Sequence, residues 1–208
     1  QTLHNLCSSE IVSLFADRNV LDLVFSLTSI FRHQKSYHYD EPKEIQDALN
    51  LFAMMTPLFQ SGSSVMQGKE EALACSMHHL ATAIQHSTGN VHMKQDEMLL
   101  KWAQIFAEAA KNPGFCTAYS KESNLETLQV ILDLAYKQTI IKYLVPEAMF
   151  TGIKRLLIQS SSAKHIFLQQ ENMNILYTWL MPQGNGGPTA PFLKMASSLF
   201  EVLMLFPL

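Results

Sequence analysis

Charged residues are scarce in this chain. Asp, Glu, Lys and Arg make up 16% of its 208 residues, whereas soluble domains typically carry about 25%. The apolar fraction of 48% is ordinary, so we expect part of the nominal surface to be covered in the full assembly. The net charge is −3, and the 15 Lys and Arg are scattered along the chain. Because attraction to phosphates needs clustered basic side chains, these features argue against direct nucleic-acid binding.

Cysteine is also rare, and signals for export or membrane insertion are missing. Cys7, Cys75 and Cys116 are odd in number and far apart, with no CxxC pair, so they form no disulfide framework. The sequence contains no Asn-x-Ser/Thr acceptor site. No apolar run approaches the roughly 18–20 residues that span a bilayer, and no charged-then-apolar leader opens the chain. We therefore expect an intracellular protein, cytoplasmic or nuclear, with reduced thiols and no membrane partner.

Motifs typical of enzymes are absent. The sequence has no nucleophile elbow, no Gly-rich phosphate loop and no HExxH motif. Cys75, His78 and His79 have i, i+3, i+4 spacing, which on a helix brings all three side chains toward one metal ion. The sequence specifies no fourth ligand, and a small buried cysteine beside surface imidazoles is the simpler interpretation. We expect no enzymatic activity, no cofactor and no metal site.

What the sequence has throughout is helical periodicity. Apolar residues recur at three- and four-residue spacing between turn signals, and no segment alternates as a strand would. The pattern predicts an all-α fold. The predicted helices cover about 3–17, 20–31, 42–59, 69–86, 95–111, 115–121, 124–135, 146–158, 163–170, 172–180 and 191–206. Asn19 and Asn124 are predicted N-caps, and Pro57 is predicted to kink or end its helix.

Two patterns recur along the chain. The first lies where a short helix is followed by a medium one. An apolar or aromatic residue is followed, after any four residues, by Asn and an apolar residue, and then, after any two residues, by Leu. This pattern is centred on Asn19, Asn124 and Asn172, and the last two are 48 residues apart. The second is a polar stripe at i, i+4, i+7 on each long helix, with starts 54, 50 and 47 residues apart. The stripes are Lys43/Asp47/Asn50, Glu97/Lys101/Gln104, Glu147/Thr151/Lys154 and Lys194/Ser198/Glu201.

In this layout of short, medium and long helices the chain resembles the armadillo/HEAT helical-repeat superfamily, whose units run about 40–47 residues. The resemblance covers the single domain of residues 1–208 as four degenerate units, at about 3–60, 64–112, 113–160 and 163–206. It implies a right-handed α-solenoid of about four armadillo-like repeats. It also implies that the long helices line a groove for a peptide or helix of another protein, with the polar stripes facing that groove.

The function that we expect is a non-enzymatic scaffold that binds a partner protein in this groove or at the C-terminal end. Trp and Arg are favoured as contacts because they dominate interface energetics. The predicted partner-binding residues are Lys101, Trp102, Gln104, Lys154, Arg155, Lys194 and Ser198.

Two alternatives stay open. The last helix is apolar all round near its end, so it must be buried on most sides. Phe200 and Leu203 are therefore candidates for a self-association surface. The other alternative is an all-α enzyme or small-ligand domain with converging polar groups in its core. The chain begins with Gln1 and stops within an apolar segment, and we expect it to be a fragment of a longer protein.

Overall fold

The computed structural model describes residues 18–33, 43–59, 63–87, 92–137, 144–181 and 189–206. Every regular element in these ranges is a helix, which confirms the all-α prediction for them. The elements are α2 (Arg18–Leu27), η1 (Thr28–His33), α3 (Lys43–Met55), η2 (Thr56–Phe59), α4 (Glu70–His86), α5 (His92–Ala109), α6 (Pro113–Tyr119), α7 (Glu122–Lys137), α8 (Leu144–Gln159), α9 (Ser161–Phe167), α10 (Gln170–Thr178) and α11 (Ala190–Leu203). The helix predicted at 3–17 lies outside the described residues.

Local sequence signals account for several helix ends. The α-helical part of the third predicted helix stops at Met55, and Pro57 lies in the 3-10 turn η2, as expected of a residue that lacks a backbone N–H. Asn112 begins α6 by accepting from the Gly114 N–H at 2.9 Å. Ser160 begins α9 in the same way, because its hydroxyl accepts from the Ala163 N–H at 3.1 Å.

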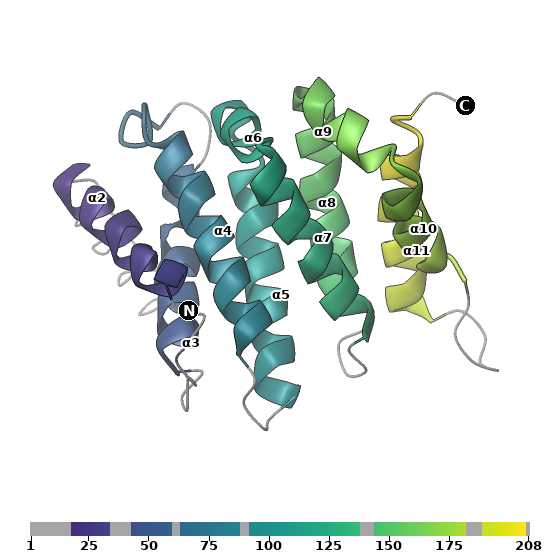
Figure 1. Cartoon of the computed structure of the whole chain (residues 1–208), viewed down its shortest axis with the longest axis horizontal. Coiled ribbons are helices and arrows are strands. Elements are labelled where there is room, and N and C mark those ends of the chain that lie inside the picture. The colour runs from purple at the N-terminus through teal and green to yellow at the C-terminus, as the bar shows by residue number, and fades with distance from the viewer. Residues whose placement is uncertain are drawn as a thin grey trace.

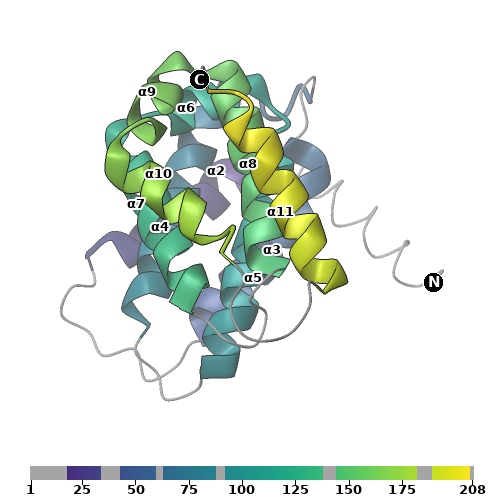
Figure 2. The same ribbon diagram turned by 90° about the vertical axis from the view of Figure 1, so that its right-hand side faces the viewer.

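The helices form two layers. The long helices α3, α5, α8 and α11 follow one another in one layer, and α2, α4, α7 and α10 follow one another in the second (Figure 1). Viewed from the C-terminal end, α11 and α8 lie on one side of the molecule and α10 and α7 on the other (Figure 2). Each long helix therefore packs mainly against the next long helix and against the layer behind it.

The interior between the layers is apolar and rich in aromatic rings. Trp102 and Phe106 of α5 are fully buried and stacked, with ring centroids 5.2 Å apart. Phe115 and Tyr119 of α6 pack on Phe106 at centroid distances of 6.1 and 5.2 Å. Such clusters bury a large apolar area and fix the relative positions of the helices. Of the helices in the described ranges, none combines the length and hydropathy that a membrane span requires.

The recurring asparagine has a different role from the predicted N-cap. Asn124 lies inside α7, which begins at Glu122, so the capping prediction is wrong for this residue. Its side-chain Nδ2 donates to the Ala118 carbonyl at 3.5 Å, and Asn172 donates to the Ile166 carbonyl at 2.7 Å. In both cases the acceptor lies six residues earlier, near the end of the preceding short helix, where carbonyls lack helical partners. Asn19 lies in α2, and its side chain is outside the described set.

Replacing Asn172 by alanine is expected to lower the free energy of unfolding by about 1 kcal/mol, because a buried amide–carbonyl hydrogen bond is lost. Asn124→Ala should cost less, since its bond is longer. Urea unfolding followed by circular dichroism measures both. Glu126→Ala, an exposed position on the same helix as Asn124, is the control. Equal losses at positions 172 and 126 would mean that the Asn172 side-chain bond contributes nothing.

Candidate functional site

The four polar stripes predicted on the long helices all reach the surface. None of their twelve side chains is buried, and the exposed members include Lys43, Glu97, Gln104, Lys194 and Glu201. The apolar residues between them face the interior, as an amphipathic helix requires. This confirms that the stripes are solvent-accessible.

Stripes of neighbouring helices lie side by side. Lys101 of α5 donates to the side-chain Oδ1 of Asn50 on α3. Lys154 of α8 forms an ion pair with Glu201 of α11, with Nζ and Oε2 2.5 Å apart. These bonds place the stripes of α3 with α5, and of α8 with α11, on one side of the layer. They also mean that Lys101 and Lys154 already have partners within the chain.

The predicted contact residues differ in how accessible they are to a partner. Gln104 and Lys194 are exposed and Ser198 is half-buried, so all three are accessible to a partner. Arg155 is half-buried, and its Nη1 donates to the Ala107 carbonyl of α5. It therefore links α8 to α5 instead of projecting from a groove.

The prediction that Trp102 contacts a partner is wrong. Its side chain has 0% exposure, and its indole Nε1 donates to the Met77 carbonyl at 2.9 Å. Trp102 follows Lys101 of the stripe, and one helical step turns a side chain by about 100°. That rotation carries the indole from the surface into the interior between α5 and α4.

The outward side of α11 carries a row of exposed apolar side chains. Leu193, Phe200 and Met204 are 55%, 56% and 82% exposed. Their spacing of seven and four residues puts them on one face of the helix. The sequence identified Phe200 and Leu203 as surface candidates. Phe200 is exposed, whereas Leu203 is half-buried and does not belong to the exposed row. The seven-and-four spacing places Leu193 and Met204 on the same face as Phe200, but it does not tell whether a neighbouring helix covers that face.

The same face is buried on the preceding long helix. On α8, Pro146, Ile153 and Leu157 have the same seven-and-four spacing, and all three are buried. In each helix the apolar row begins one residue before the polar stripe. α11 packs against α8, and Lys154, one residue after Ile153, reaches Glu201 of α11. Leu193, Phe200 and Met204 are therefore exposed at positions whose counterparts on α8 are buried.

Figure 2 faces this end of the molecule, with α11 running along it. Lys194 and Glu201 are exposed beside the apolar row and give it one positive and one negative charge at its edge. Tyr177 of α10 and Met181 are also exposed, at 48% and 66%. The arrangement of an apolar centre with a polar edge is the one found at protein interfaces.

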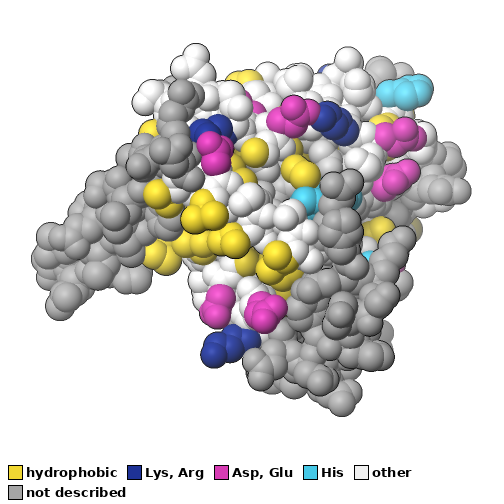
Figure 3. Space-filling model, turned by 60° about the vertical axis from the view of Figure 1, so that its left-hand side comes forward, with side chains coloured by type: hydrophobic (Ala, Val, Ile, Leu, Met, Phe, Trp, Pro, Cys, Tyr) yellow, Lys and Arg dark blue, Asp and Glu magenta, His cyan; other side chains and the backbone are white. Residues whose placement is uncertain are grey.

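A second apolar surface lies at the α2 end. Figure 3 shows hydrophobic side chains gathered there, and the large exposed ones on these elements are Leu23, Leu27 and Ile30 of α2 and η1 and Met54 of α3. The whole length of α11 is described, so its apolar row is the better-defined candidate site.

Cys75, His78 and His79 lie on α4, as their spacing predicted. His78 turns toward α7, where its Nδ1 is 2.9 Å from the Thr127 hydroxyl, and burial lowers the pKa of this imidazole. His79 turns toward η1 and the hydroxyl of Thr28. Within the described ranges, no group of three His, Cys, Asp or Glu side chains is placed to hold a metal ion.

No family model, no curated protein and no solved structure matches the chain.

Proposed function

We propose that the chain is a non-enzymatic protein-binding module that docks an amphipathic helix of a partner protein on the outward face of α11. The proposed scaffold is a right-handed α-solenoid of about four armadillo-like units, ending in α9, α10 and α11. Two features support this architecture: the long helices pack in succession in one layer, and the asparagine-to-carbonyl bond recurs in the third and fourth units.

The observation that carries the proposal is the uncovered apolar row of Leu193, Phe200 and Met204. Monomeric proteins rarely expose contiguous large apolar side chains unless a partner covers them. On α8 the residues at the equivalent positions are buried, and α11 packs against this helix. The occupant that best fits the row on α11 is accordingly another helix, packed as α11 packs on α8.

The chemistry of the face specifies the occupant further. Its helix would carry apolar residues at i, i+3 or i+4, and i+7, because these positions line one face and fill a groove on the partner surface. Lys194 at the edge favours an acidic residue beside that apolar stripe, whereas Glu201 is already paired with Lys154 of α8. Such edge charges affect orientation and association rate more than affinity.

Site-specific photo-crosslinking tests the location. A benzophenone amino acid at Ser197, which is exposed in the middle of α11, should crosslink a partner from cell extract, and mass spectrometry of the crosslink identifies the bound segment. The matched control carries the same probe at Gln104 on the polar face of α5. A crosslink through position 104 alone would move the site to the polar stripes and contradict the proposal.

The identified segment, made as a peptide, then allows a direct test. Phe200→Glu with Met204→Glu is expected to weaken binding at least about ten-fold, because apolar side chains at an interface centre contribute most of the affinity. Lys194→Ala at the edge should change affinity little. Circular dichroism checks that the double variant remains folded. Unchanged binding by the double variant would exclude α11 as the docking surface.

Self-association through the same face is the second candidate, favoured by the exposure of Phe200. Light scattering of the wild-type chain over a range of concentrations distinguishes it. A dimer that Phe200→Glu and Met204→Glu convert to a monomer would identify the occupant of α11 as a second copy of the chain, and would overturn the assignment to a partner protein.

A further inference from the structure

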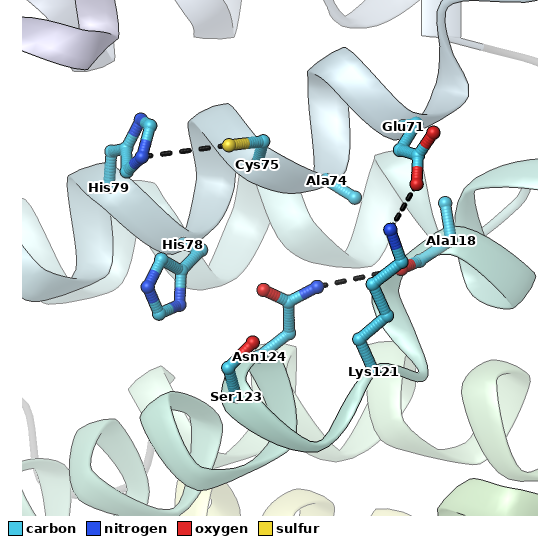
Figure 4. A pocket seen from close by; sticks show the side chains of 9 residues that line it. All are labelled: Glu71, Ala74, Cys75, His78, His79, Ala118, Lys121, Ser123 and Asn124. Carbon is cyan, nitrogen blue, oxygen red and sulfur yellow. Dashed lines mark hydrogen bonds and ion pairs between the residues drawn. The ribbon is translucent and has the colours of Figure 1, made fainter. Parts of the chain in front are cut away.

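A cavity of about 400 Å³ opens in the second layer, between α4 and the α6–α7 turn. Figure 4 shows Cys75, His78 and His79 on α4, with Lys121 and Asn124 on the other wall of the cavity. This region lies away from the α11 face and has no part in the proposed docking. It nevertheless brings a thiol, two imidazoles and an ammonium group to one opening.

Cys75 and His79 form a pair in this cavity. They are one helical turn apart on α4, and Cys75 Sγ lies 3.5 Å from His79 Nε2. The cysteine is exposed, whereas the histidine is only 7% exposed. The thiol is thus accessible to a molecule in the cavity, while the imidazole behind it is held in the protein.

A hydroxyl on the other side of the imidazole favours the tautomer with its proton on Nδ1. Thr28 Oγ1 lies 2.8 Å from the Phe25 carbonyl and 3.0 Å from the Ser76 hydroxyl, and each of these oxygens can accept the Thr28 proton. The oxygen of Thr28 is then an acceptor for His79 Nδ1, 3.4 Å away. With its proton on Nδ1, the neutral imidazole presents the lone pair of Nε2 to the Cys75 thiol. Thr28 is 2% exposed, so the hydroxyl beside the imidazole lies inside the fold.

From this geometry we propose that Cys75 is a nucleophilic thiol that forms a mixed disulfide with small-molecule disulfides entering the cavity. His79 acts as its base, and Thr28 is a positioning residue that orients His79. A nucleophile within hydrogen-bond reach of a base, which a third group orients, is the arrangement that activates thiols in proteins. The proposal is independent of what binds α11.

The reaction is balanced without any further oxidant. The Cys75 thiol gives its proton to His79 Nε2, and the sulfur attacks one sulfur of the small disulfide. The new S–S bond forms as the old one breaks, and the leaving thiolate takes the proton from His79. One disulfide and one thiol are consumed, and one mixed disulfide and one small thiol are produced.

Cys116 provides a control within the same chain. Its side chain has 0% exposure, and its Sγ lies 3.3 Å from the Ala110 carbonyl. Burial raises the pKa of the Cys116 thiol to about 12, against a smaller opposing effect of the Arg155 charge. The attacking species is the thiolate, so Cys116 should stay unmodified while Cys75 reacts.

The test uses glutathione disulfide as the probe, on the folded chain, at about pH 7, where an ordinary thiol is mostly protonated. Trypsin cuts after Lys69, Lys94, Lys111 and Lys121, so Cys75 and Cys116 lie in separate peptides. Mass spectrometry then follows the glutathione adduct on each cysteine over time. We expect Cys75 to be modified at least about ten-fold faster than the same residue in the urea-unfolded chain, since a positioned base accelerates proton removal.

Variants distinguish two explanations for fast modification of Cys75: the action of His79 as a base and the exposure of the thiol alone. His79→Gln should slow modification of Cys75 at least about ten-fold, and Thr28→Val should give a smaller loss. His78→Gln is the matched control, because His78 lines the same cavity but hydrogen-bonds to Thr127 and not to Cys75. It should leave the rate unchanged. Melting curves check that each variant is folded at the assay temperature.

A pH profile provides the decisive readout. The other titratable groups at the cavity are Glu71, His78 and Lys121. At about pH 10 an ordinary thiol is ionised without help, so the wild type and His79→Gln should react at the same rate there. A rate difference that persists at this pH would assign His79 a structural role. The proposal would be overturned if the wild type and His79→Gln reacted at the same rate at about pH 7 as well as at about pH 10. It would also be overturned if Cys75 reacted no faster in the folded chain than in the urea-unfolded chain.

Discussion

Replacing Trp102 by alanine is expected to lower the free energy of unfolding by about 3–5 kcal/mol, the range for a fully buried large aromatic side chain. Three losses contribute. The indole has 0% exposure, its ring stacks on Phe106 at 5.2 Å, and its Nε1 donates to the Met77 carbonyl. A domain of ordinary size has about 5–15 kcal/mol of stability in total, so this one change removes a large part of it.

Chemical denaturation followed by far-ultraviolet circular dichroism measures the effect. Gln104→Ala, an exposed position on the same helix, is the control and should change the free energy by no more than about 0.5 kcal/mol. A loss at Trp102 as small as the loss at Gln104 would contradict the burial of the indole between α4 and α5.

This result decides how Trp102 variants are used in binding studies. A chain weakened by several kcal/mol loses partners because its folded population falls, whatever surface the partner uses. Loss of binding in Trp102→Ala would therefore carry no information about the interface. Variants at Phe200 and Met204 change exposed side chains and avoid this difficulty.

Replacing Gly152 by alanine is the second change expected to have a large effect. It should lower the stability of the fold, although alanine has a higher intrinsic helix propensity than glycine. In an exposed helix this change would stabilise the protein by about 1 kcal/mol. At Gly152, however, an added Cβ would lie 2.5 Å from two ring carbons of Phe106 and 3.3 Å from the Cα of Ala107. Overpacking of a dense interior typically costs about 1–3 kcal/mol, so we expect a net loss of stability.

The Phe106 ring cannot easily move aside. It is fully buried and packs against Trp102, Phe115 and Tyr119 at ring-centroid distances between 5.2 and 6.1 Å. At Gly152 α8 passes close to α5, and a methyl group there would push the two long helices apart. The loss should appear as a lower urea midpoint with an unchanged slope.

A double-mutant cycle with Phe106→Leu isolates the clash. Leucine removes the ring carbons that the new methyl group would meet, so Gly152→Ala should cost less in the Phe106→Leu background than in the wild type. Residues in direct contact typically couple by about 0.5–3 kcal/mol. If the two changes are additive, the steric explanation is wrong. If Gly152→Ala stabilised the otherwise wild-type chain, helix propensity would outweigh the steric cost of packing at this position.

Much of the helical layout could be predicted from the sequence, because it depends on local signals. Apolar spacing and Pro57 gave element type and approximate bounds. The interpretation of Asn124 failed for a physical reason. A capping asparagine and one that binds the carbonyl of a preceding short helix occupy similar places in sequence, and only the three-dimensional path of the turn distinguishes them.

The candidate site was only partly predictable. The polar stripes follow from periodicity within one helix, and all four reach the surface. Exposure of Leu193, Phe200 and Met204 depends on whether a neighbour covers α11. The sequence of α11 alone does not contain that information, since Pro146, Ile153 and Leu157 have the same spacing and are buried. Trp102 was predicted to lie on the surface with its neighbour Lys101. One residue along a helix turns the side chain by about 100°, which is enough to move it from the surface to the interior.

The two tryptophans lie in different neighbourhoods, which gives the molecule two optical reporters. Trp102 stacks on Phe106 in the middle of the layers, and Trp179 packs edge-on against Phe150 with ring centroids 6.3 Å apart, near α10 and α11. Both are buried in the folded chain, so exposure to water shifts the emission of each to longer wavelength. Variants that keep one indole, with phenylalanine at the other position, would therefore report separately on opening at the centre and at the C-terminal end.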